Sequence, residues 1–333
     1  MKLLVVGIDG LDARLCKKWK KRLPGIGQFF EHGSIRSVKP TMPPITPISW
    51  TTVHTGMNPR SKRRPGGHGV LGFRKRKGVP FLLEDAGHKT IWELIGTDYR
   101  VGVIHMPMMI PVPPFFGGKI NGFVIADRPL GHWVGRKEVQ TKRTVWPEDL
   151  AEMAAQVACW PVDIDPAYSR KSNPAAKMKL GTALWKKVEQ RRPEGVKMIL
   201  EKYPVDVLAV GSSIVDRMCH VAHHLGQKGW HQRIRPAFET ADRLIMELIV
   251  ATRPENVMLV SDHGVSPQPG GKLWGHSLHA TVAGLGSRFG TGWVNKPKRS
   301  VACFAPTVME VLGIPKDRWD HMQGRVATEL FAE

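Results

Sequence analysis

Five short apolar segments constrain the fold of this chain more than any other feature. Each segment ends in or near a Gly, Asp or Pro. They occupy residues 3–9, 101–107, 123–127, 206–212 and 256–262. Runs of this length are typical of strands that are buried on both faces of a sheet. Segments with helical periodicity alternate with them, at 88–96, 148–157, 175–202, 233–252 and 306–312. This alternation predicts an α/β fold in which helices flank a central, mostly parallel sheet.

The length of 333 residues is enough for one large domain with a sizeable core. The stretch from about 128 to 200 is rich in Lys, Arg, Trp and Pro and contains no convincing strand. We therefore expect a single domain over residues 1–333, with a mainly helical cap region inserted at about 128–200.

The charge balance favours anionic partners. Lys and Arg total 49 against 29 Asp and Glu, which gives a formal net charge of +20. Nucleotides, nucleic acid and anionic membrane surfaces are the partners that such a charge attracts. Two basic clusters, KKWKKR at 17–22 and RKRK at 74–77, contribute to it.

Cysteine usage and the N-terminal sequence indicate the compartment. Cys16, Cys159, Cys219 and Cys303 form no CxxC pair, which excludes a zinc ribbon and a dense disulfide scaffold and favours free, buried thiols. The apolar run that begins at Leu3 is too short to span a bilayer, and it ends at an acid. We expect a first buried strand, no membrane segment and a cytoplasmic location.

Acidic residues at strand ends identify the candidate site. Asp9 and Asp262 each close an apolar run, and Asp216 follows a third. Functional groups gather at the carboxyl ends of parallel strands, so these three acids are candidates. His220 lies one helical turn after Asp216, and His263 directly follows Asp262. One such residue is typical of a helix cap or a core histidine, but the set together predicts metal binding.

Six blocks of the sequence form a series in a fixed order. They are VVGIDGLD (5–12), PPITPISWTTVHTGMNP (43–59), DRMCH (216–220), SDHG (261–264), GHS (275–277), and APTVMEVLGIP (305–315) with MQGR (322–325). In this series the chain resembles, almost end to end, the type I phosphodiesterases and nucleotide pyrophosphatases of the alkaline phosphatase superfamily. The resemblance implies an alkaline phosphatase-like fold and hydrolysis of an anionic, nucleotide-like phosphate ester.

The resemblance also implies two divalent metal ions, zinc in most of the family, with manganese as the alternative. One ion would be held by Asp216, His220 and His276, and His279 is a possible substitute for His276. The other would be held by the residues Asp9, Asp262 and His263, with the Thr46 oxygen facing it. Mixed imidazole and carboxylate ligands suit zinc better than magnesium or calcium.

Thr46 is the nucleophile that the resemblance implies, because it lies ten residues before Gly56, as the family's nucleophile does before its Thr-Gly pair. Attack by Thr46 would form a phosphothreonine intermediate, which water then hydrolyses. A threonine hydroxyl needs activation to act as a nucleophile at neutral pH. We expect a helix to begin near Pro47 and to add backbone donors for the phosphoryl oxygens.

The chain departs from the family pattern at two places. Ser49 stands where we expect the family to have an Asn that holds a phosphoryl oxygen, so Ser49 is the candidate substrate contact. A basic insertion, RSKRRPGG, separates Pro59 from His68, and its cations are expected to recruit anionic substrate: Arg60, Lys62, Arg63 and Arg64.

Three alternatives to a diesterase follow from the same residues. A phosphomonoesterase of the superfamily fits the same site. A sulfatase fits less well, because no Cys or Ser stands in a CxPSR arrangement. A non-enzymatic protein that contacts nucleic acid or anionic surfaces would explain the positive charge alone.

Overall fold

The computed structural model describes residues 1–59, 66–75, 81–112, 121–127, 144–154, 157, 173–268, 275–295 and 299–332. Nine strands form one sheet in the order β11-β2-β10-β7-β1-β6-β3-β4-β5. The five central strands run parallel to one another. They are β7 (Asn256–Val260), β1 (Leu3–Ile8), β6 (Val207–Ser212), β3 (Val101–Ile104) and β4 (Gly122–Ile125). The predicted α/β fold with a mostly parallel sheet is thereby confirmed.

Both faces of the central strands are covered, as their uninterrupted apolar sequences predict. Along β1, the side chains of Leu3 and Val5 belong to one hydrophobic cluster, and those of Leu4 and Val6 to the other. Successive side chains of a strand point to opposite faces, so this strand contributes equally to two cores. Every residue of β1 is buried.

The outer strands were not predicted from the sequence. β10 (Ala280–Gly286) lies antiparallel to both β7 and β2 (Gly33–Val38). β11 (Gly292–Trp293) extends the sheet beyond β2, and β5 (Val145–Trp146) pairs antiparallel with β4. Gly, Ser and Ala make up much of β2 and β10, which lack the apolar runs that mark the central strands.

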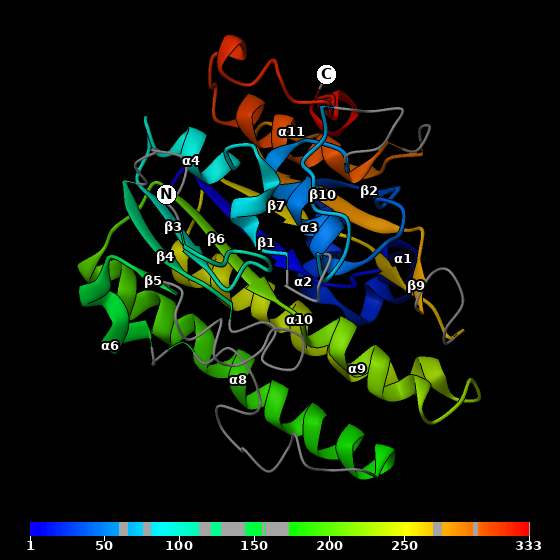
Figure 1. The fold of residues 1–333 in the computed structure, drawn as a ribbon. Helices are drawn as coiled ribbons and strands as arrows, with labels where there is room; N and C mark the ends of the chain where they lie inside the picture. Colours follow the sequence, from blue (N-terminus) through cyan, green and yellow to red (C-terminus); the bar gives the residue numbers. More distant parts are fainter. Residues whose placement is uncertain are drawn as a thin grey trace.

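The helices form a layer on each face of the sheet (Figure 1). On one face lie α3 (Thr46–Thr55), α4 (Ile91–Ile95) and α11 (Phe304–Val311). The other face is covered by α1 (Ala13–Trp19), α2 (Pro24–Glu31), α8 (Pro174–Lys202), α9 (Ile214–His223) and α10 (Trp230–Thr252). The sheet therefore has a helical layer on each side, and one hydrophobic core lies between the sheet and each layer.

The long helix α8 confirms the helix that we predicted at 175–202. Asn173 caps it by accepting hydrogen bonds from the backbone N–H groups of Ala175 and Ala176, and Pro174 fills its first position. The helix packs against α9 and α10. A short helix, α6 (Ala151–Ala154), precedes it. Residues 128–143, 155–156 and 158–172 lie outside the described part of the chain, so the inserted cap stays a prediction.

Two further expectations concern the cysteines and the membrane. Cys16, Cys219 and Cys303 are free and buried, as predicted, and Cys159 lies outside the described residues. Among the helices that the structure describes, none combines the length and the apolar character that crossing a bilayer requires.

Candidate active site

The side chains that we expected to bind metal meet at the carboxyl edge of the central strands. Asp9 directly follows β1, and Asp262 and His263 follow the adjacent strand β7. Asp216 and His220 lie one turn apart on α9, which begins two residues after β6 ends. Because β7, β1 and β6 are neighbours in the sheet, their ends bring these side chains into one place.

A two-stranded ribbon adds His276 to this group. β8 (Gly264–Val265) and β9 (His276–Ser277) pair antiparallel, with Val265 opposite His276. The imidazole of His276 consequently stacks on that of His263, with ring centroids 3.7 Å apart. His279, the alternative ligand, instead forms a hydrogen bond through Nδ1 with Ser37 Oγ at 3.1 Å. The structure therefore brings His276, and not His279, to the cluster.

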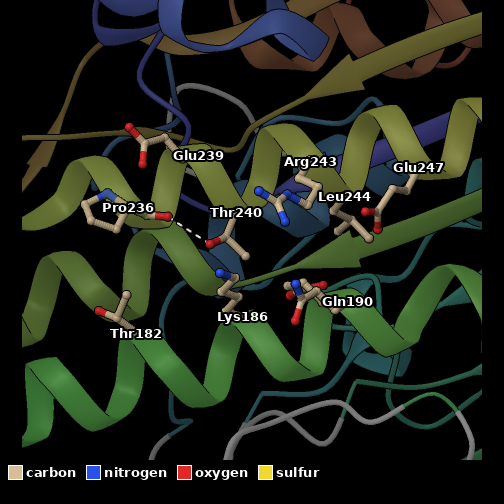
Figure 2. A pocket seen from close by; sticks show the side chains of 10 residues that line it. Thr182, Lys186, Gln190, Pro236, Glu239, Thr240, Arg243, Leu244 and Glu247 are labelled. Atoms are coloured by element: carbon tan, nitrogen blue, oxygen red, sulfur yellow. Dashed lines mark hydrogen bonds between the residues drawn. The ribbon is translucent and has the colours of Figure 1, made fainter.

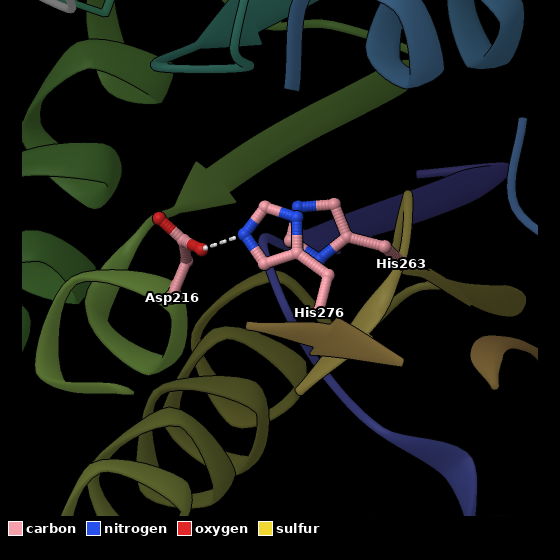
Figure 3. Close-up of side chains that lie close together, drawn as sticks. All are labelled: Asp216, His263 and His276. Atoms are coloured by element: carbon pink, nitrogen blue, oxygen red, sulfur yellow. Dashed lines mark ion pairs between the residues drawn. The ribbon is translucent and has the colours of Figure 1, made fainter. Parts of the chain in front are cut away.

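The first set of ligand atoms forms a nearly equilateral triangle. Asp216 Oδ1 lies 3.2 Å from His220 Nε2 and 3.3 Å from His276 Nε2, and the two nitrogens are 3.2 Å apart. His263 also approaches this set, since Asp216, His263 and His276 offer ligand atoms within 4.8 Å of one another (Figure 3). Asp216 and His276 are buried, whereas the side chain of His220 is 42% exposed. Solvent therefore reaches this set from the side of His220.

The second set lies deeper. His263 Nε2 is 3.4 Å from Asp9 Oδ1 and 3.3 Å from Asp262 Oδ2. At most 1% of each of these three residues is exposed. Their ligand atoms also lie within 4.8 Å of one another. Atoms that bind one tetrahedral zinc at about 2.0–2.1 Å stand roughly 3.3 Å from one another. All three pairs of the first set and the two pairs that His263 makes in the second set have this spacing.

The hydrogen bonding at the cluster is also that of a metal site. Four buried atoms that face one another have no hydrogen-bond partner: Asp9 Oδ1, Asp216 Oδ1, Asp262 Oδ2 and His263 Nε2. Leaving a buried polar group without a partner is costly, and such groups are rare in folded proteins. Divalent cations held by the two sets would satisfy all four. The residues present therefore fit the metal that the fold implies.

The charges of the three carboxylates act on one another. Burial, followed by the charge of Asp216, raises the pKa of Asp9 to about 7. Burial and the charges of Asp9 and Asp216 raise the pKa of Asp262 well above its ordinary value. Burial opposes the ionisation of Asp216 as well, but the imidazoles of His220 and His276 outweigh it and hold the pKa of Asp216 well below its ordinary value. Such mutual repulsion is relieved when a cation binds.

Backbone carbonyls orient two of the imidazoles. His276 Nδ1 donates to the carbonyl of Pro44 at 2.5 Å, and His263 Nδ1 donates to that of Gly264 at 3.1 Å. With the proton on Nδ1, each Nε2 lone pair points into the cluster. The bond to Pro44 also ties β9 to the loop that leads into Thr46.

Thr46 is the first residue of α3 and lies beside the second set. Its hydroxyl donates to Asp9 Oδ2 at 3.4 Å. The helix contributes fewer backbone donors than we expected, because Pro47 has no N–H and the N–H groups of Ile48 and Ser49 bond to the Ile45 carbonyl. Within the described residues, the Thr46 N–H is the donor of this turn that remains for a ligand.

The expected substrate contacts have different outcomes. Ser49 is buried, and its hydroxyl forms a 2.5 Å hydrogen bond with Thr41 Oγ1. Its role in substrate binding stays a prediction. Arg60, Lys62, Arg63 and Arg64 lie outside the described residues.

Some residues that support the site were not found from the sequence. Gly10, at a φ of 81°, has no room for a side chain, since a Cβ would lie 3.1 Å from the backbone nitrogen of Asp216. Ser261 Oγ accepts from the Leu11 N–H at 2.8 Å and donates to the His263 carbonyl at 2.6 Å. The Gly of GIDG and the Ser of SDHG were visible, but only the packing shows what each holds.

A buried ion pair supports the end of β6 from behind. Glu189 and Arg192 of α8 are each 1% exposed and lie 3.2 Å apart. Ser212 Oγ donates to Glu189 at 2.6 Å, and Arg192 donates to the Gly211 carbonyl. This pair was not predicted from the sequence.

The remaining histidines mostly have structural roles. His54 is buried between the Pro107 carbonyl and the Trp92 N–H. His68 bonds to Thr52 Oγ1 at 3.0 Å. Two histidines follow His220 at the end of α9. His224 is exposed, and His223 bonds to the Ser266 carbonyl at 2.7 Å and stacks on Trp230.

A separate cavity of about 240 Å³ lies between α8 and α10, away from this cluster (Figure 2). Its wall mixes Lys186 and Arg243 with Glu239 and Glu247, and Thr240 donates to the Pro236 carbonyl at 2.9 Å. The opposite charges balance one another, so this cavity offers no comparable centre for catalysis.

Solved structures with a similar fold identify the class. The alkaline phosphatase PafA matches at 13% identity over 99% of both chains, with a TM-score of 0.63. Murine ectonucleotide pyrophosphatase / phosphodiesterase 5 matches at 11% over the whole of both chains, with a TM-score of 0.57. The PsFucS1 sulfatase from Pseudoalteromonas sp. matches at 15% over all of this chain and 72% of its own, with a TM-score of 0.55. The fold is that of the alkaline phosphatase superfamily.

The sequence places the chain more narrowly. Residues 3–279 match the type I phosphodiesterase / nucleotide pyrophosphatase family. The chain belongs to this family, and it is a hydrolase of the alkaline phosphatase superfamily. A comparison with curated protein sequences gave no match.

Proposed function

We propose that the protein hydrolyses phosphate diesters or pyrophosphates of nucleotide-like substrates. In this proposal Thr46 is the nucleophile and two divalent metal ions assist it, with zinc as the metal that suits the ligands best. The observation that carries this proposal is the pairing of two ligand sets with zinc-like spacing and a threonine hydroxyl beside one of them. Asp216, His220 and His276 would hold one ion, and the other set of three would hold the second. Bound dications would stabilise the charge on the attacking and leaving oxygens.

The residues of the chain supply the nucleophile and its orientation. The Thr46 hydroxyl loses its proton to solvent as Oγ1 attacks phosphorus, and the bond from phosphorus to the leaving oxygen breaks. The leaving oxygen takes up a proton, and Thr46 becomes esterified to a phosphoryl group that still carries the rest of the substrate. Asp9 Oδ2 accepts the hydrogen bond of the Thr46 hydroxyl and so fixes the direction of its oxygen. A water molecule then attacks the phosphorus of this phosphothreonine ester, breaks its bond to Thr46, releases a phosphate monoester and restores the hydroxyl.

The neighbouring activities define the substrate panel that tests the proposal. Solved relatives with this fold include an alkaline phosphatase and sulfatases, whose names describe monoester and sulfate hydrolysis. Purified protein is reconstituted with zinc or manganese and assayed with an aryl phosphate diester, an aryl monoester, an aryl sulfate and a nucleotide pyrophosphate. Greatest kcat/KM on the diester or the pyrophosphate supports the proposal. A preference for the monoester or the sulfate would assign the chain to that activity instead, and no turnover would leave the anionic-surface binder.

Metal dependence is tested by Asp262→Asn. Replacing this carboxylate removes one ligand charge from the second set, so we expect lower metal occupancy and at least a hundredfold loss of turnover, roughly the effect of losing an essential ligand. Asp242→Asn is the matched control, because Asp242 is equally buried but caps α2 through the N–H groups of Gly25 and Ile26. Equal metal content in both variants would contradict the assignment.

A further inference from the structure

The first two helices carry many positive charges and almost no negative ones. Residues 13–32 contain six Lys and Arg and one acid, Glu31. Five of these cations follow one another on α1 and the short 3₁₀ helix Lys20–Arg22, and all five are exposed: Lys17, Lys18, Lys20, Lys21 and Arg22. The sixth, Arg14, lies 3.4 Å from Asp12. For the other five, the structure records no ion pair with a described carboxylate.

Two aromatic rings lie beneath these lysines. Phe30 of α2 and Trp293 of β11 stack with their centroids 6.0 Å apart and their planes inclined by 6°. Lys17 Nζ lies 4.7 Å from the Trp293 ring centroid, and Lys20 Nζ lies 5.6 Å from that of Phe30. Both rings are half-buried, and each ammonium is held over a ring by cation–π attraction. Two of the five cations, Lys17 and Lys20, therefore lie next to aromatic surface.

We propose that this surface, the five cations with Phe30 and Trp293, binds single-stranded nucleic acid. A row of cations that follows the phosphates, next to aromatic faces that accept bases, is the combination that single strands need. An anionic membrane would also attract the charge, but a helix that binds a membrane surface exposes large apolar side chains. The exposed large hydrophobics of the described residues lie elsewhere: Met42, Leu71, Met198, Val250 and Leu278.

The surface is separate from the catalytic cluster. α1 begins at Ala13, four residues after Asp9, and its seven residues carry the chain about 10 Å along the helix axis. Lys17, Lys18 and the cations that follow them lie toward its far end. Binding here holds a strand that is longer than the hydrolysed group, so it acts on substrate capture and leaves bond breaking unchanged. The binding of nucleic acid at this surface does not require that the proposed hydrolysis takes place.

The test compares two variants of equal charge. In the first, Lys17, Lys18, Lys20 and Lys21 become Gln. In the second, four exposed cations of α8 become Gln: Lys179, Lys187, Arg191 and Lys197. Gln keeps the helix propensity of Lys and Arg. The probe is a fluorescent oligothymidylate with phosphorothioate linkages, which resist hydrolysis, and its Kd is measured over a range of KCl concentrations.

We expect the first variant to raise Kd at least tenfold and to lower the slope of log Kd against log salt by about 3, since each phosphate contact on a single strand contributes about 0.7. The α8 variant should retain the wild-type slope. Trp293→Leu should raise Kd severalfold without changing the slope, because stacking does not depend on salt in this way. Turnover of a small aryl diester should be the same in all variants, which separates this test from that of the proposed function.

A footprint on the unaltered protein provides a second measurement. Bound oligonucleotide should protect Lys17, Lys18, Lys20 and Lys21 from acetylation more than Lys179 and Lys187. Equal protection at both places, or equal loss of binding in the two charge variants, would overturn the proposal. Binding of phosphatidylserine vesicles in place of the oligonucleotide would assign the surface to a membrane and would also overturn it.

Discussion

At the residue scale, a substitution of Thr46 tests catalysis separately from metal binding. Thr46→Ala removes the attacking oxygen and, since the side chain is only half-buried, little packing. We expect a loss of roughly several orders of magnitude in kcat/KM on an aryl diester, with nearly unchanged zinc content. Thr46→Ser keeps a hydroxyl and should retain much more activity. Because Ser49 is bonded to Thr41, Ser49→Ala should stay within about tenfold of wild type. Full activity of Thr46→Ala would mean that another group attacks.

His54 makes a second prediction at this scale. Burial lowers the pKa of His54 to about 4, against the small opposing effect of its bond to Pro107. In the folded protein the neutral ring accepts from Trp92 and donates to Pro107, whereas the unfolded chain takes up a proton below about 6.5. The stability that neutral His54 provides is therefore present above pH 6.5 and is lost as the pH falls toward 4.

The measurement is the free energy of unfolding of metal-free protein against pH. Between pH 7 and pH 4, wild type should lose up to roughly 3 kcal/mol more than His54→Gln, which has no proton to bind at this position. Any constant offset from the change in shape is removed by comparing slopes. Parallel curves for the two proteins would contradict the assignment.

At the scale of elements, the end of α3 depends on a glycine. Gly56 ends the helix with a φ of 67°, and its carbonyl accepts from the N–H groups of Gln323 and Gly324. A Cβ here would lie 2.9 Å from Met322 Sδ and 3.1 Å from Ala305 Cβ. Gly87 has almost the same φ, 65°, but open space around it.

Gly56→Ala and Gly87→Ala therefore form a matched pair. Each should lower stability by about 1 kcal/mol for the left-handed backbone alone. Gly56→Ala should lose about 1–3 kcal/mol more, because the methyl group must displace the buried side chain of Met322 and press on Ala305. Thermal unfolding of both variants measures the difference. Equal losses would show that the contact between α3 and Met322 relaxes without strain.

The elements also show how far the sequence predicts this fold. β1, β6 and β7 were found because parallel strands covered on both faces have continuous apolar sequences. β2 and β10 were missed because their small and polar residues, including the fully buried Arg36, become strands only by pairing with each other and with β7. The pairing of β2 with β10 joins residues more than 200 positions apart, which local patterns do not encode.

At the scale of the whole molecule, most of the candidate site could be predicted, because its ligands stand at strand ends. The choice of His276 over His279 could not, since it depends on the register of the β8–β9 ribbon and on a bond to Pro44. The same holds for Ser49: its position in the sequence suggests the site, but only the structure shows that its hydroxyl bonds to Thr41. Ligand identity follows from motifs, and ligand direction from packing.

The central claim is that Thr46 becomes phosphorylated during turnover, beside two metal ions. The most direct measurement is mass spectrometry of zinc-loaded protein, quenched in acid during turnover of an aryl diester and digested. We predict that the peptide containing Thr46 gains one phosphoryl group that still carries the second ester group of the diester, and that this adduct is absent from Thr46→Ala and from protein treated with a chelator. A phosphoryl group on Ser49 or Thr51, or none at any time while the diester is being hydrolysed, would contradict the account.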